Sequence, residues 1–167
     1  MTVDLFTLLL LGGGLFLGWA LGANDSANVF GTAVGTRMLR FGTAAILCSG
    51  GVILGAVISG AGPTETLGKL AAIKSVAEAS IASACAGLTV LFMTRRGLPV
   101  STSQAVVGAL VGWNIWNGFD TDMEVASKIM LTWVLCPFLA AGIAALLLPI
   151  TSFAIQKSRF HLFQQDA

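Results

Sequence analysis

Four polar side chains follow the first apolar run of the chain within five positions: Asn24, Asp25, Ser26 and Asn28. A carboxylate beside a hydrocarbon-spanning run is costly unless it is paired, hydrated or bound to a cation. Asn and Asp side chains also compete with the helical backbone for hydrogen bonds. We therefore predict that the first membrane helix breaks here. Its oxygen ligands would hold a coupling cation, with Asp25 and Asn28 as candidate Na⁺ ligands and Asn24 beside them.

A second polar stretch begins the fourth apolar run, where Pro99 and Val100 precede Ser101, Thr102, Ser103 and Gln104. Proline favours a first helical turn, and Ser and Thr cap free amide groups. The unpaired N–H groups of such a turn carry partial positive charge, so the hydroxyl groups beside them could hold a tetrahedral oxyanion. A plain helix cap is the alternative for this motif alone. A cation site and an anion site in one small membrane chain indicate cation-coupled anion transport.

The composition places the chain in a membrane. Hydrophobic residues make up 56% of the 167 residues and charged residues only 10%, with a mean hydropathy of +0.87. Soluble domains carry roughly 25% charged residues. The net charge of +1 gives no indication of a nucleic-acid partner. Neither a nucleophile–base pair nor a metal cluster is evident in the sequence, so we expect no enzyme activity.

The hydropathy pattern predicts an all-α integral membrane protein with about five membrane segments, the first of them broken. The apolar runs cover residues 5–21, 41–61, 76–93, 99–116 and 129–150. The third and fourth runs either cross fully or form a re-entrant hairpin. Glycines at positions 14, 18 and 22 form one face on which another helix could approach closely. Residues 1–155 would form one transmembrane unit and residues 156–167 a polar cytoplasmic tail.

The distribution of basic residues predicts the orientation. Cytoplasmic loops carry an excess of Lys and Arg. The basic side chains expected in the cytoplasm are Arg37, Arg40, Arg95, Arg96, Lys157 and Arg159. The N-terminus would then lie outside and the C-terminus inside a cell membrane, the inner or plasma membrane.

Two motifs resemble a known family. The stretch GANDSANVFGTAVGTR, residues 22–37, resembles the signature of the inorganic phosphate transporter (PiT) family, which typically reads GANDVANAFGTSVGSR. The stretch PVSTSQAVVGA, residues 99–109, is similar to its PVSTTHAIVGA element. The resemblance implies symport of phosphate, or sometimes sulfate, with Na⁺ or H⁺ and no other cofactor. It also implies that Asn24, Asp25 and Asn28 lie near the ion and anion site, with the Ser101–Ser103 hydroxyl groups on the oxyanion.

The sequence departs from the family pattern in two ways. Many members carry a glutamate near the start of the second span, where this chain has the carboxylate-free stretch CSGGV, residues 48–52. Family transporters also contain two inverted repeats, and this sequence contains one signature. The resemblance therefore implies one half of an alternating-access carrier, which would pair with a second chain of opposite topology. A homodimer is the alternative assembly, and a permease for sulfate or another oxyanion, or a non-transporting membrane subunit, is the alternative function.

Overall fold

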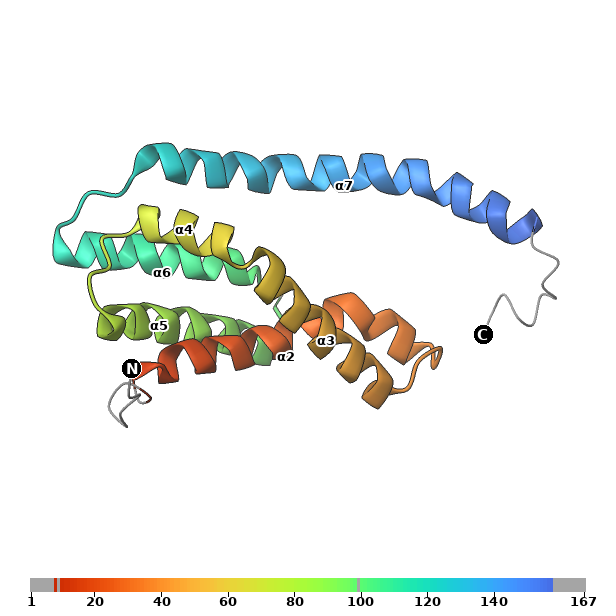
Figure 1. The fold of residues 1–167 in the computed structure, drawn as a ribbon, viewed down its shortest axis with the longest axis horizontal. Helices are drawn as coiled ribbons and strands as arrows, with labels where there is room; N and C mark the ends of the chain where they lie inside the picture. The colour runs from red at the N-terminus through yellow and green to blue at the C-terminus, as the bar shows by residue number, and fades with distance from the viewer. Residues whose placement is uncertain (1–7, 9, 99, 158–167) are drawn as a thin grey trace. The chain divides into compact units, whose positions relative to one another are not determined.

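The computed structural model describes residues 8, 10–98 and 100–157, and within them every regular element is an α-helix. The chain divides into two units, one ending at Met123 and the other beginning at Glu124. Among the described residues, the first unit contains the five helices α2 to α6, and α7 forms the second unit (Figure 1). The predicted all-α class is confirmed. The polar tail from residue 158 and Pro99 lie outside the described residues.

Helix α2, Gly12–Gly35, runs through the first polar stretch without interruption. The predicted break at residues 22–28 is therefore wrong. Ser26 donates its hydroxyl hydrogen to the carbonyl oxygen of Gly22 within the helix, at 2.6 Å. The side chains of Asn24 and Asp25 find partners on other segments, so they do not compete for the backbone of their own helix.

Helix α5, Val76–Arg95, packs along α2 in the same direction (Figure 1). The amide of Gly13 donates to the Ser80 hydroxyl at 3.2 Å, and a Cβ atom on Gly13 would lie 1.9 Å from the Ser80 carbonyl oxygen. Further along, a Cβ atom on Gly87 would meet the ring of Phe16 at 2.8 Å. Small residues thus set the spacing of these two helices.

The glycines of this contact differ from the predicted ones. Gly14, Gly18 and Gly22 lie on an exposed face of α2, where a Cβ atom added to any of them would have no described atom within 4 Å. Gly13 on α2 and Gly87 on α5 make the close approach instead.

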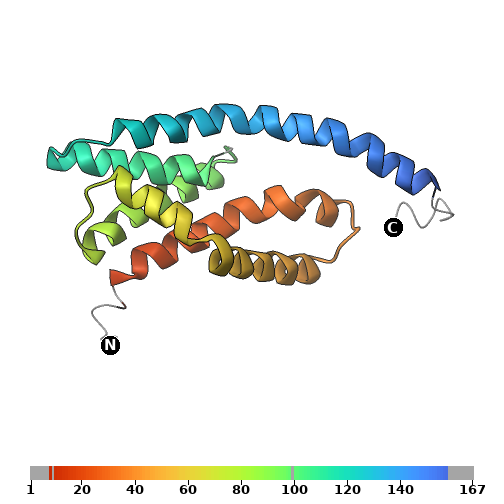
Figure 2. The same cartoon turned by 45° about the horizontal axis from the view of Figure 1, so that its top comes forward.

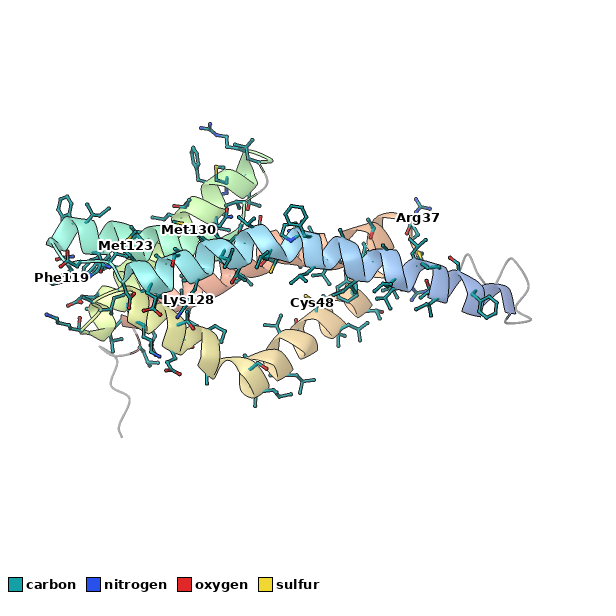
Figure 3. All side chains as sticks on the ribbon, turned by 90° about the horizontal axis from the view of Figure 1, so that it is seen from above. Arg37, Cys48, Phe119, Met123, Lys128 and Met130 are labelled. Atoms are coloured by element: carbon teal, nitrogen blue, oxygen red, sulfur yellow. The ribbon has the colours of Figure 1, made fainter. Side chains whose placement is uncertain are left out.

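Helix α6, Thr102–Asn117, returns antiparallel to α5 and completes a helical hairpin. The predicted helix start is confirmed, because Ser101 is the N-cap and accepts a hydrogen bond from the Gln104 amide at 3.4 Å. Gly118 ends the helix in the left-handed conformation, with φ of 68°. Figure 3 shows Phe119, after α6, and Arg37, after α2, at opposite ends of the first unit. The start of α6 lies beside the middle of α2, where Thr102 contacts Asp25.

Helices α3, Phe41–Ser59, and α4, Ala61–Leu70, are separated only by Gly60. Helix α3 runs back beside the second half of α2, and α4 packs against α6 (Figure 2). Helix α4 begins at the end of the predicted run of residues 41–61 and continues beyond it to Leu70. Its Pro63 sits in the first turn, where a missing amide hydrogen is tolerated. On its exposed surface, the ammonium group of Lys69 binds Glu65 at 2.6 Å and lowers the pKa of that carboxyl group.

A fully buried amide, that of Asn114, joins α6 to the end of α4. Its Nδ2 donates to the Leu70 carbonyl oxygen at 3.0 Å and to the Thr121 hydroxyl at 3.1 Å. Its Oδ1 accepts from the Ala72 amide at 3.2 Å. Buried polar groups of this kind stabilise the fold only when their donors and acceptors have hydrogen-bond partners. Here both the nitrogen and the oxygen of the Asn114 amide have such partners. The base of the α5–α6 hairpin is thereby fixed to α4.

Helix α7, Met123–Lys157, is longer than the predicted run of residues 129–150. It has Glu124 in its first turn and continues through both Pro137 and Pro149. Within the part of the chain that the structure describes, three helices are long and apolar enough to cross a membrane, by length and composition: α3, α5 and α7, the last counted as Met123–Phe153. Each matches one of the five predicted runs. Helix α6 has only 16 residues, about 24 Å at 1.5 Å per residue, which is shorter than a hydrocarbon layer of about 30 Å.

Candidate functional site

The two polar stretches of the sequence meet in the first unit. The Thr102 hydroxyl, in the first turn of α6, lies 3.1 Å from each carboxylate oxygen of Asp25 on α2. Thr102 is buried, with 6% of its surface exposed, and Asp25 is half-buried. The hydroxyl hydrogen is therefore shared between two charged acceptors. This contact fixes the start of α6 against the middle of α2.

Asn24, the neighbour of Asp25, contacts three groups. Its Nδ2 donates to Asp25 Oδ1 at 2.8 Å and to the Val100 carbonyl oxygen at 3.1 Å. Its Oδ1 accepts the hydroxyl hydrogen of Thr94, near the end of α5, at 3.0 Å. The amide thus links α2 to both sides of the turn between α5 and α6.

The remaining hydroxyl groups of the second stretch face outward. Ser101 and Ser103 are exposed, and their Oγ atoms lie 3.1 Å apart. Gln104 is exposed one turn into the helix. The first amide hydrogens of α6 lie beside these groups and carry the positive end of the helix dipole. The surface formed by Ser101, Ser103 and Gln104 could bind an oxyanion with hydroxyl and amide donors, whereas the Thr102 hydroxyl is directed at Asp25.

The cation ligands predicted from the first stretch are only partly assembled. Asn28 lies one turn after Asp25 on α2 and is exposed, and among the described residues no hydrogen bond of its side chain is found. Ser26 is also exposed and bonds only its own helix. A carboxylate has about four lone-pair positions, so Asp25 keeps acceptor capacity beyond Thr102 and Asn24. The described residues hold no cluster of three His, Cys, Asp or Glu ligands for a metal ion.

Thr94 and the Val100 carbonyl oxygen did not emerge from the sequence. Thr94 lies at the end of an apolar run, next to two arginines, where a threonine carries no distinctive signal. A backbone carbonyl carries none at all. Their role becomes visible only because Asn24 reaches across the turn to both of them.

Comparison with known proteins identifies the family. The family model described as the phosphate transporter family matches residues 21–165, which include both polar stretches and the contact between them. The chain belongs to this family. It is accordingly a multi-pass membrane protein of a transporter family, and a transporter family is not an enzyme class. No solved structure gives a significant match.

The relatives of this chain in the phosphate transporter family are longer than the chain itself. A Pyrococcus furiosus protein, provisionally named a phosphate permease, is 32% identical over 93% of this chain and 39% of its own length. A Methanocaldococcus jannaschii protein with the same kind of name is 36% identical over 72% of this chain and 39% of its own length. The phosphate-repressible phosphate permease of Neurospora crassa is 29% identical over 82% of this chain and 26% of its own length. The chain thus spans less than half of each of these relatives.

Proposed function

We propose that this chain forms one half of a secondary transporter that moves inorganic phosphate across a membrane together with Na⁺ or H⁺. The observation that carries the proposal is the hydrogen bond between Thr102 and both oxygens of Asp25. It makes the candidate cation ligand and the start of the candidate anion helix direct neighbours. A cation bound or a proton taken up at Asp25 would change the charge beside the anion site, which couples the two cargoes electrostatically.

The position of this contact along α2 supports transport rather than a surface role. Asp25 lies near the middle of α2, about 20 Å from Gly12 and about 15 Å from Gly35 at 1.5 Å per residue. Transporters commonly bind their cargo near the bilayer midplane, at the ends of discontinuous helices. Because α6 is short and its start lies beside the middle of α2, we propose that α5 and α6 act as a re-entrant hairpin. The tip of such a hairpin must be hydrated, since it carries Arg95 and Arg96.

The roles of the individual residues follow from their surroundings. Asp25 would be the main cation ligand or the proton acceptor, and the Asn28 side-chain oxygen could complete a Na⁺ site from the exposed side of α2. Phosphate would be held by the first-turn amides of α6, by the Ser101 and Ser103 hydroxyl groups and by Gln104. Sulfate has the same tetrahedral shape, so competition between the two anions in uptake assays distinguishes the phosphate permease from a sulfate permease.

The Ser103→Ala variant tests the anion site. Loss of one hydroxyl contact to a charged oxygen weakens binding by about 1.5–3 kcal/mol, or about 10- to 100-fold. We expect the half-saturation concentration for phosphate uptake to rise by that factor, with expression unchanged. The control is Thr89→Val, which removes an exposed hydroxyl group that bonds only its own helix, at Cys85. If phosphate affinity is unchanged in the Ser103 variant, the Ser101 and Ser103 hydroxyl groups do not bind phosphate and act only at the start of the helix.

The charge distribution of the chain bears on how it assembles. Six Lys and Arg residues would face the cytoplasm, with Arg95 and Arg96 among them at the hydrated hairpin tip, against Lys69, Lys74 and Lys128 outside. This bias favours a single orientation, with the N-terminus outside and the C-terminus in the cytoplasm. An antiparallel homodimer is thereby disfavoured. We propose pairing with a second chain of opposite topology, along the exposed face of α2 that carries Gly14, Gly18 and Gly22.

Reporter fusions and affinity purification test this assembly. A reporter on the C-terminus should be active only in the cytoplasm, and the purified chain should bring with it a second chain that carries the same signature. Equal labelling of the C-terminus from both sides of the membrane would show dual topology and favour the antiparallel homodimer. Purification of the chain with only identical copies in one orientation would favour a parallel homodimer.

A further inference from the structure

The turn between α5 and α6 is closed by a side chain from another helix. Thr94 is the second-last residue of α5, and Val100 directly precedes the N-cap Ser101. Asn24 binds the Thr94 hydroxyl at 3.0 Å and the Val100 carbonyl oxygen at 3.1 Å. One amide therefore joins both sides of the turn to α2, next to Asp25.

The neighbours of the Asn24 amide determine which way its nitrogen and its oxygen face. The Val100 carbonyl oxygen and Asp25 Oδ1 are both acceptors, so both must face the Nδ2 group of Asn24. The two hydrogens of Nδ2 are then fully used. The Oδ1 atom must point the other way, where the Thr94 hydroxyl donates to it. Asn24 in this state has no hydrogen left to offer an anion, and its position depends on Thr94.

We propose that Thr94 is a positioning residue of the anion site. Its hydroxyl group holds the Asn24 amide in the orientation that binds Val100, and Val100 sets where the first turn of α6 lies relative to Asp25. Asn24 is then a bridge between helices rather than a ligand of phosphate or of the cation. This inference rests on the proposed function for the identity of the cargo, but the hydrogen-bond chain from Thr94 to Val100 is independent of it.

Three variants separate the hydroxyl group from the rest of the side chain. Thr94→Val keeps the shape and removes the hydroxyl group, whereas Thr94→Ser keeps the hydroxyl group and removes the methyl group. Thr89→Val makes the same chemical change on the same helix, at a hydroxyl group bonded within α5. Each full-length variant is compared with the unmodified chain for thermal stability, for phosphate uptake under a Na⁺ or pH gradient, and for amide hydrogen exchange.

We expect Thr94→Val to raise the half-saturation concentration for phosphate about tenfold, as the loss of one useful hydrogen bond would. The maximal rate should change less, and the melting temperature should match that of Thr89→Val. Amides at the start of α6, residues 102–105, should exchange faster in Thr94→Val only, and Thr94→Ser should restore both readouts.

Several results would overturn the inference. One is a Thr94→Val variant whose half-saturation concentration for phosphate and amide hydrogen exchange are both unchanged. Another is a Thr94→Ser variant with the same rise in half-saturation concentration as Thr94→Val. The third is a loss of phosphate uptake in Thr94→Val that a lower melting temperature explains entirely. If the unmodified chain takes up no phosphate under either gradient when it is produced together with its partner chain, the proposed function fails. The exchange of residues 102–105 then decides the positioning role by itself, because it requires no cargo.

Discussion

Replacement of Asp25 by asparagine should abolish cation-coupled phosphate uptake, with a loss of at least about 100-fold. Asparagine has the same shape and can still accept one hydrogen bond from Thr102, so α6 should keep its place beside α2. The negative charge is lost, and with it the strongest ligand for a cation or the acceptor for a proton. A difference of about 3 kcal/mol in cation binding corresponds to this factor. Uptake into cells or proteoliposomes, with and without a Na⁺ or pH gradient, measures it.

Glu65→Gln provides the matched control for this experiment. It also converts a carboxylate to an amide in the first unit, but Glu65 is an exposed partner of Lys69 on α4. Exposed pairs of this type contribute little, so we expect uptake within about twofold of the unmodified chain. Both variants should reach the membrane in equal amounts. Unimpaired coupled uptake in the Asp25 variant would refute the assignment of Asp25 as the coupling residue.

Gly13→Ala should destabilise the first unit more than other single methyl additions on α2. The new Cβ atom would lie 1.9 Å from the Ser80 carbonyl oxygen, which belongs to the backbone of α5 and cannot rotate away. Added atoms in a packed contact usually cost about 1–3 kcal/mol, and a backbone clash lies at the upper end of that range. We expect a clear fall in the melting temperature of the purified protein and in the amount that accumulates in the membrane.

The adjacent residue supplies the control. Gly14→Ala adds the same methyl group to the same helix, where no described atom lies within 4 Å. Because alanine is favoured over glycine in a helix by about 1 kcal/mol, this variant should be neutral or slightly stabilised. Equal melting temperatures for the two variants would show that α2 and α5 do not pack as closely as this contact requires. A defect in Gly14→Ala during assembly, without loss of stability of the chain alone, would support the proposed partner face.

Features that depend on local composition could be predicted from the sequence. Hydropathy alone identified the membrane segments that became α3, α5 and α7, because the exclusion of charged residues over about 20 positions needs no knowledge of neighbours. The start of α6 was equally predictable, since a serine three residues before an amide caps it within the same segment. The two signature motifs also placed the chain in its family before any contact was known.

Only the tertiary structure decided how the polar groups are used. Asn24 and Asp25 predicted a broken helix because their partners, Thr94, Val100 and Thr102, lie 70 to 77 positions away in sequence. With those partners in place, the side chains are paired and α2 continues unbroken. Likewise, the sequence shows a row of glycines on α2, but the position of α5 determines that Gly13 is the one in close contact. Residue type gives each group its hydrogen-bonding capacity and size, whereas its partner is set by which helices pack together.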